Sequence, residues 1–143
     1  MSNPDDHLGF LISDVARLMR TVFDRRVRRL GLTRAQWLAL TRLHRRPGAS
    51  QSELADMMEI EKATVGRLID RLEAKGWVER RPDPQDSRVR RVYLRNEATP
   101  VFMMMSEEGQ KTFRTLLKGI DAPAEAALLE GLRRIKANAE GSS

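Results

Sequence analysis

The sequence contains no cysteine in its 143 residues. This absence excludes a disulfide framework, a thiol-based redox switch and a thiolate metal site. No apolar run approaches the length of a membrane span. The first ten residues, MSNPDDHLGF, carry early acidic residues and no basic segment, so we expect no secretory signal peptide. Together these absences favour a cytoplasmic protein.

Histidine is equally scarce. His7 and His44 fall on different predicted helices, and neither has a nucleophile or a second metal ligand at suitable spacing. No glycine-rich phosphate-binding motif is present. We therefore expect the chain to be neither an enzyme nor a protein with a metal or cofactor.

Positive charge, by contrast, is abundant and unevenly placed. Apolar residues make up 41% of the chain and charged residues 32%, which is typical of a globular protein, and the length suits a single domain over residues 1–143. The net charge of +6 is concentrated in residues 33–95, and residues 80–95 contain six arginines against two aspartates. A surface that binds a polyanion has this pattern. A solvated charged face has it too, so charge alone leaves both interpretations open.

Apolar residues recur at helical spacing through most of the chain. Capping boxes at residues 33–36 and 50–53 begin two of the helices, and Gly31 and Gly76 end two others. The pattern predicts helices over residues 7–30, from 33 to the Pro47-Gly48 stop, and over 50–58, 62–75, 97–118 and 124–137, with a frayed end at 140–143. After Gly76 the period changes to two, which predicts short strands over 77–80 and 90–94 around a turn at 82–87. The expected fold class is mainly α with a small β-wing.

Residues 51–70 match a helix-turn-helix motif. Such a motif needs apolar residues where two short helices meet and a small residue at their close approach. Ala55 is the small residue, and Glu59 occupies the turn position where glycine is common. The five apolar positions are filled by Leu54, Met58, Ile60, Val65 and Leu68.

The second helix of the motif has an outward face that suits DNA. Its inward stripe is Val65, Leu68, Ile69 and Leu72, which leaves small or basic residues on the other side. Small residues let a helix enter the major groove, and long basic ones reach base edges or phosphates. Asp70 is the exception, and we expect it to orient Arg67 or Arg71, both within helical reach. The alternative is an ordinary surface helix.

The hairpin that follows makes the motif a winged helix, and its arginines would lie along the phosphate backbone or enter the minor groove. We expect Asp86 to hold the guanidinium of Arg88 in one orientation, although an exposed turn with an incidental ion pair would look the same in sequence. The residues expected to contact DNA are Ser50, Gln51, Lys62, Ala63, Thr64, Arg67, Arg71, Asp86, Arg88 and Arg90.

The run IEKATVGRLIDRLEAKGWVERRPDPQDSRVRRVYL resembles the signature of the MarR family of bacterial transcriptional regulators. The matching parts are the DRLEAKG stretch at 70–76, the Asp-Ser-Arg tip at 86–88 and the Val-Tyr-Leu exit at 92–94. The flanking helices extend the resemblance over nearly the whole chain. Residues 95–97, Arg-Asn-Glu, depart from the family pattern of Thr and a nearby Gly, which affects the start of the following helix rather than DNA contact.

The resemblance implies a winged helix-turn-helix lobe over residues 33–95 and dimerisation helices over 7–31 and 97–139. It further implies a homodimer that binds a pseudo-palindromic operator in double-stranded DNA, usually as a repressor. The residue pattern supports a dimer independently, because the terminal helices carry more apolar surface than a small wing domain can cover. Expected interface residues are Leu8, Leu11, Ile12, Leu128, Leu132 and Ile135.

Family members often release DNA when a small aromatic or anionic effector binds between the dimer helices and the DNA-binding lobe. On matching elements, the expected pocket residues are His7, Phe10, Asp14, Trp37, Met103 and Met104. Each also has a packing interpretation: Trp37 as a core residue, the methionines as fillers of irregular gaps, and His7 as an exposed helix start. The alternative function is a winged-helix protein-interaction module without specific DNA readout.

Overall fold

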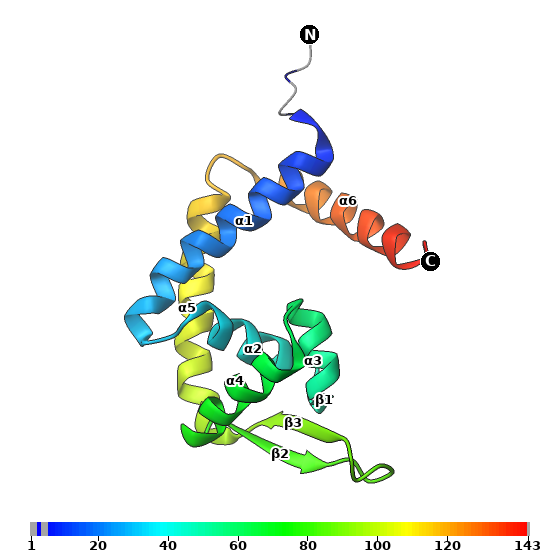
Figure 1. Cartoon of the computed structure of the whole chain (residues 1–143). Helices are drawn as coiled ribbons and strands as arrows, with labels where there is room; N and C mark the ends of the chain where they lie inside the picture. Colours follow the sequence, from blue (N-terminus) through cyan, green and yellow to red (C-terminus); the bar gives the residue numbers. More distant parts are fainter. Residues whose placement is uncertain (1–2, 4–5, 143) are drawn as a thin grey trace. The chain divides into compact units, whose positions relative to one another are not determined.

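The computed structural model describes residue 3 and residues 6–142 (Figure 1). The chain forms two compact units, the first ending at Gly109 and the second beginning at Gln110. No helix in the described ranges is long and apolar enough to cross a membrane. The elements are, in chain order, α1 (Leu8–Val27), η2 (Arg28–Leu30), α2 (Arg34–Arg45), β1 (Ala49–Ser50), α3 (Gln51–Met58), α4 (Lys62–Ala74), β2 (Val78–Pro82), β3 (Arg90–Leu94), η3 (Asn96–Ala98), α5 (Thr99–Leu116) and α6 (Ala122–Glu140).

The helix starts follow from the capping residues in the sequence. Thr33 and Gln36 form the expected capping box, each side chain accepting the backbone N–H of the other residue. The hydroxyl of Ser50 accepts the N–H of Glu53 at 3.0 Å, but the carboxylate of Glu53 lies 3.5 Å from the guanidinium of Arg91. The second predicted box is therefore a one-sided cap, with Glu53 turned to the wing.

Several helix boundaries differ from the sequence prediction, and two of these differences have a clear local cause. The last turn expected of the first helix is a 3₁₀ turn, and Gly31 closes it in the left-handed conformation, φ 79°. Helix α6 begins two residues earlier than expected, because Asp121 accepts the N–H of Ala124 at 2.9 Å and Pro123 lies in the first turn. A proline there forfeits no helical hydrogen bond.

The wing is part of a three-stranded antiparallel sheet with strand order β1-β3-β2. The hairpin of β2 and β3 was predicted, but β1 was not, because two residues are too few to show alternation. It pairs Ala49 with Val92 and Ser50 with Arg91. In the β2–β3 register Arg81 lies opposite Arg91, a repulsive pairing unless each arginine has its own carboxylate.

The core of the first unit confirms the helix-turn-helix prediction. The expected inward stripe of α4, namely Val65, Leu68, Ile69 and Leu72, is buried. Leu54 and Ala55 of α3 are buried as well, while Met58 and Ile60 are partly buried against the same cluster. Full burial of a Leu or Ile side chain contributes about 1.5–3 kcal/mol, so this stripe fixes which face of α4 remains exposed.

Glu59 ends α3 in the left-handed conformation, φ 55°, the position where the motif commonly has glycine. A residue with a side chain is destabilised by roughly 1–2 kcal/mol in this conformation. A glycine avoids that strain, but its unfolded state is more flexible, so part of the gain in stability is offset. We expect Glu59→Gly to raise the free energy of unfolding by about 0.5–1 kcal/mol in urea titrations.

The matched control is Glu107→Gly, the same change at an exposed position inside α5. There glycine should lower stability by about 0.5–1 kcal/mol. If both variants lose stability, the left-handed backbone at Glu59 carries no strain that glycine relieves.

Candidate nucleic-acid interface

The outward face of α4 carries the residues that were predicted from the sequence to lie on it. Lys62, Ala63, Thr64, Arg67 and Arg71 are all exposed, since the buried stripe lies on the other side of the helix. The guanidinium of Arg67 donates to the hydroxyl of Thr64 at 3.3 Å. Within residues 6–142, neither Lys62 nor Arg71 forms an ion pair. The first turns of α4 therefore offer cationic groups beside small side chains.

Asp70 does not orient a neighbour on its own helix, and that expectation was wrong. Its carboxylate lies 2.8 Å from the guanidinium of Arg80 on β2. Arg80 also binds Glu73 at 3.0 Å, so a residue of the hairpin neutralises both carboxylates of α4. The number of arginines in the sequence did not indicate that Arg80, ten residues along the chain, is the partner of Asp70.

The six arginines of residues 80–95 divide into two groups. Four that lie outside the wing tip form ion pairs within the protein. Besides Arg80, these are Arg81 with Glu79, Arg91 with Asp83 and Arg95 with Glu97, and Arg81 also lies over the ring of Tyr93. Arg90 is exposed, with no ion pair to any described residue. Arg88 is paired but remains 89% exposed in its side chain. Most of the local positive charge is thus paired with carboxylates of the protein, although Arg81 and Arg95 keep 57% and 45% of their side chains exposed. Arg88 and Arg90 are the exposed arginines at and beside the wing tip.

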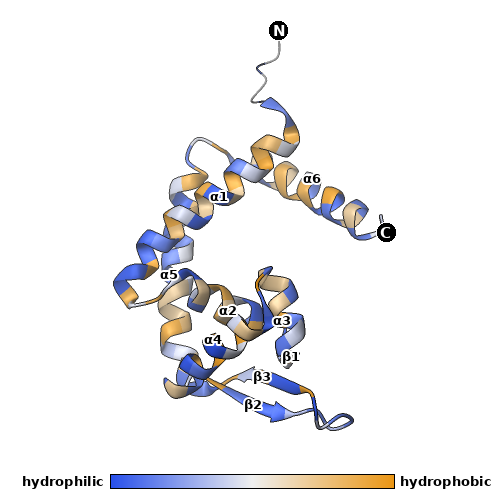
Figure 2. Cartoon of the chain, viewed as in Figure 1, coloured by the Kyte–Doolittle hydropathy of each residue, from blue (hydrophilic) through white to orange (hydrophobic). Residues whose placement is uncertain are grey.

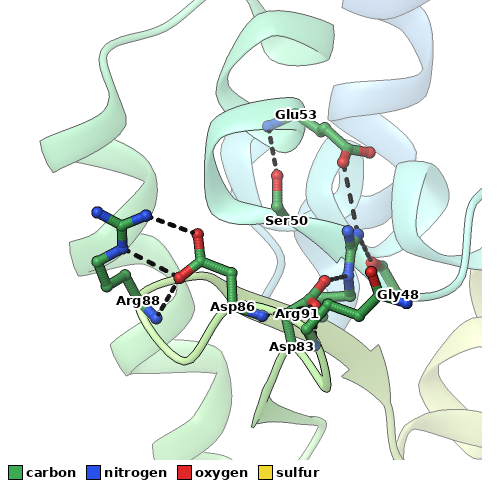
Figure 3. Close-up of polar contacts among 8 residues, drawn as sticks. Gly48, Ser50, Glu53, Asp83, Asp86, Arg88 and Arg91 are labelled. Atoms are coloured by element: carbon green, nitrogen blue, oxygen red, sulfur yellow. Dashed lines mark hydrogen bonds and ion pairs between the residues drawn. The ribbon is translucent and has the colours of Figure 1, made fainter.

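The expected pair at the wing tip is present (Figure 3). One carboxylate oxygen of Asp86 accepts the backbone N–H and the Nε–H of Arg88, both at 3.0 Å, and the other accepts Nη2 at 3.2 Å. These bonds hold the pKa of Asp86 below its ordinary value, the side chain of Arg88 being the main cause. The guanidinium is therefore held in one orientation before any partner arrives.

Asp83 shapes the turn behind that tip. Its Oδ1 accepts the backbone N–H groups of Gln85 at 2.7 Å and Asp86 at 3.2 Å, and its Oδ2 accepts Nε of Arg91 at 2.6 Å. The N–H of Gln85 and the side chain of Arg91 are the chief reasons that the pKa of Asp83 is lowered. A carboxylate thus performs the turn-forming role that glycine often has.

The wing is anchored to the loop before β1 at Gly48 (Figure 3). The N–H of Gly48 donates to the carbonyl of Val92 at 3.1 Å, and its carbonyl accepts Nη1 of Arg91 at 3.0 Å. Gly48 is buried and left-handed, φ 78°, and a Cβ at this position would lie 2.8 Å from the hydroxyl oxygen of Tyr93. Backbone conformation and packing therefore both require glycine.

The lowered pKa values of Asp83 and Asp86 predict how the wing responds to acid. Because both carboxylates bind protons more weakly in the folded chain, their contribution to folding stability is fully present above the ordinary pKa of 3.8. It is lost as the pH falls below that value and through the lower folded values. We expect carboxyl NMR titrations of both residues to have midpoints below 3.8, the ordinary value. Midpoints at or above 3.8 would contradict the hydrogen-bonded turn.

Two expected DNA-contacting residues lie at the start of α3. The hydroxyl of Ser50 caps the helix and the residue is only 7% exposed, so it presents little surface to DNA. Gln51 is half-buried, and its Oε1 accepts Nε of Arg80 at 2.6 Å. Arg80 was not among the residues expected to contact DNA, but its hydrogen bond to Gln51 makes it part of this surface.

Five of the six expected effector-binding residues are exposed side chains of α1, its N-cap and α5. His7, Phe10 and Asp14 are exposed along α1, where the His7 and Phe10 rings lie 5.3 Å apart. Met103 and Met104 are exposed on α5. A surface hollow of about 440 Å³ in the first unit has a different lining: Asp24, Arg28, Gly31, Leu32, Thr33 and Arg34.

Trp37, the remaining expected pocket residue, is only 8% exposed. Its ring packs edge-on against Phe23, and its Nε1 donates to Asp24 at 2.6 Å. Burial of Asp24 opposes ionisation, but hydrogen bonds from Arg34 and Trp37 outweigh it and lower the pKa of that carboxyl. The packing interpretation therefore describes Trp37 in this structure.

The expected interface residues are exposed apolar side chains. Leu8, Leu11 and Ile12 of α1 are 37–58% exposed, and Leu128, Leu132 and Ile135 of α6 are 40–48% exposed. Figure 2 shows the apolar residues that recur along α6. Among the described residues, no cluster of three or more His, Asp or Glu side chains could hold a metal ion.

Comparisons with known proteins agree with this geometry. Residues 32–89 match the model of the MarR family. A Bacillus subtilis (strain 168) protein described as an uncharacterized HTH-type transcriptional regulator, YybA, is 27% identical over 129 residues, which are 90% of this chain and 86% of that protein.

Solved structures extend the similarity to the whole fold. The transcriptional regulator PA3341 is 34% identical, with a TM-score of 0.81 over 94% of this chain and 99% of its own. The ligand-free form of MarR from E. coli is 28% identical, with a TM-score of 0.81 over 93% of this chain and 98% of its own. The similarity covers the helices on both sides of the winged lobe.

Proposed function

This chain belongs to the MarR family of transcriptional regulators, and from that premise we propose that it binds a specific double-stranded DNA operator as a homodimer and represses transcription. One observation carries the proposal: α4 and the wing tip keep exposed cations while the neighbouring arginines are neutralised within the fold. Lys62, Arg67 and Arg71 lie on α4, and Arg88 and Arg90 lie on the wing.

The two surfaces suit different grooves. The small side chains of Ala63 and Thr64 let α4 approach base edges in the major groove. The wing tip offers Arg88 to the narrow and more negative minor groove, where an inserted arginine is favoured. Because Asp86 already orders this side chain, less conformational entropy is lost on binding. Such a protein would act in the cytoplasm, where bacterial DNA lies.

Exposed apolar side chains support the homodimer. The described part of α6 contains no buried residue, although Leu128, Leu132 and Ile135 form a stripe at helical spacing. A helix of this kind gains most of its stability from packing that stripe against another surface. A second copy of the chain provides such a surface, and two-fold symmetry then matches a pseudo-palindromic operator.

The proposal includes release from DNA on binding a small aromatic or anionic effector. Phe10, Met103 and Met104 support this part of the proposal as exposed apolar side chains in the first unit. A ligand would act by favouring dimers whose α4 helices are wrongly spaced for DNA.

The test begins by selecting duplexes from a random-sequence pool with the purified protein. We expect an enriched pseudo-palindrome with half-sites roughly 34 Å apart, bound by two chains per duplex in sedimentation equilibrium. Affinity should fall by about 10³-fold or more between 50 and 200 mM salt, since six or more phosphate contacts release counterions.

A duplex pool that shows no enrichment, together with a shallow salt dependence, would instead favour the alternative of a winged-helix module that contacts other proteins. Enrichment with one chain per duplex would retain the DNA-binding function and contradict the homodimer.

A further inference from the structure

Arg80 connects the wing to both helices of the helix-turn-helix motif. From β2, its guanidinium contacts Gln51 of α3 at 2.6 Å, and the carbonyl of Gly66 and the carboxylate of Asp70 on α4 at 2.9 and 2.8 Å. Glu73 accepts a further bond at 3.0 Å and also the backbone N–H of Arg80 at 3.3 Å. With its side chain 19% exposed, Arg80 has little donor capacity left for a phosphate.

The contact with Gln51 determines how that amide is oriented. A guanidinium can only donate hydrogen bonds, so the amide atom facing Arg80 is the oxygen. The amide nitrogen of Gln51 must then point elsewhere, and it lies 3.8 Å from the position that a Cβ on Gly66 would occupy. Gln51 thus holds its two N–H donors beside the part of α4 that has no side chain.

We propose that Arg80 is a positioning residue for DNA binding: it fixes Gln51 so that the side-chain amide donates to a phosphate oxygen of the DNA. A phosphate is the expected acceptor because the first helix of a helix-turn-helix crosses the DNA backbone. The inference rests on the proposed function. It assigns Arg80 an indirect role and gives Gln51 the direct contact.

Lysine cannot take the place of arginine here. A guanidinium has a rigid fork that reaches Gln51, Gly66 and Asp70 at once, whereas an ammonium is a compact charge on a flexible stem. Arg80→Lys therefore preserves the charge near Asp70 and Glu73 but leaves the amide of Gln51 free to rotate. This makes it the informative substitution, with thermal unfolding as the check that the variant is folded.

The experiment measures binding of one duplex, selected with the wild-type protein, by fluorescence anisotropy at fixed salt. A hydrogen bond to a charged group corresponds to about tenfold in affinity. We expect Gln51→Ala to weaken binding about tenfold, and Gln51→Glu to weaken it further, because a carboxylate keeps the bond to Arg80 but repels phosphate. Ser52→Glu, which adds the same charge at the exposed neighbouring position, measures the general repulsion and should have a smaller effect.

A double-mutant cycle tests whether Arg80 acts through Gln51. In the wild-type protein, Arg80→Lys should weaken binding about five- to tenfold. In the Gln51→Ala variant, the same change should weaken binding further by only about twofold or less. An undiminished effect in that background, or wild-type affinity for Gln51→Glu, would overturn the inference while leaving the proposed function intact. Failure of the selection itself would overturn the proposed function, and the inference with it.

Discussion

Replacing Gly48 by alanine is expected to lower the free energy of unfolding by about 2–5 kcal/mol. The left-handed backbone, φ 78°, costs a residue with a Cβ roughly 1–2 kcal/mol. The new Cβ would also lie 2.8 Å from the hydroxyl oxygen of Tyr93, and overpacking of this kind costs about 1–3 kcal/mol. Chemical denaturation at a fixed protein concentration would measure the loss.

Gly31 provides the matched control. Its backbone is almost the same, φ 79°, but nothing lies within 4 Å of a Cβ added there. Gly31→Ala should therefore show only the conformational cost, about 1–2 kcal/mol. Equal losses at the two positions would mean that Tyr93 moves aside freely, and that the anchor between the wing and the loop before β1 is not tightly packed.

Replacing Arg88 by alanine is expected to weaken operator binding by about 10–100-fold without changing stability. The Arg88 side chain is 89% exposed and held by Asp86, so its loss leaves the fold intact. An arginine in the minor groove is stabilised by the strongly negative potential there. A hydrogen bond to a charged group contributes about 1.5–3 kcal/mol to the binding free energy. Fluorescence anisotropy with the selected duplex, together with thermal unfolding of the free protein, measures both quantities.

Arg95→Ala is the control with the same change in charge. Arg95 belongs to the same basic segment, but its guanidinium is paired with Glu97 at the start of the helical region that leads into α5. We expect a loss of about threefold or less. Comparable losses for the two variants would show that binding responds to net charge and not to the position of Arg88.

Asp86→Ala separates orientation from charge. Removing a carboxylate next to a polyanion should strengthen binding if only net charge matters. We expect the opposite, a weakening of several-fold, because Arg88 loses the three hydrogen bonds that order it. Tighter binding by this variant would contradict a preorganised wing tip.

The parts of this fold that depend on neighbours in sequence could be predicted from the sequence. Thr33 and Gln36 cap a helix within one turn of each other, and the stripe from Val65 to Leu72 repeats within a single helix. The same holds at the wing tip, where Asp86 and Arg88 are two residues apart. Local geometry determines each of these features, so periodicity and spacing were sufficient.

Features that depend on tertiary contacts were missed or assigned to the wrong partner. Arg80 reaches Gln51 across 29 residues of sequence, and Asp70 pairs with it in preference to its helical neighbours. Trp37 was placed in the expected pocket although its residue type favoured the core, because a large apolar ring with one donor suits both. The arginine count indicated a basic surface, but not that most of these side chains are bound within the protein.

The register of the hairpin determines which side chains of β3 face Gly48. Arg91 and Tyr93 both contact Gly48, while Arg90, one residue away, is exposed. Since alternate residues of a strand face opposite sides, a slip of one residue in the β2–β3 register would exchange these two sides along one strand. Arg90 would then turn toward Gly48 and Arg91 would face outward. The pairing of β1 with β3 opposes such a slip, so a change in wing length is expected to be taken up in the exposed turn and not in the strands.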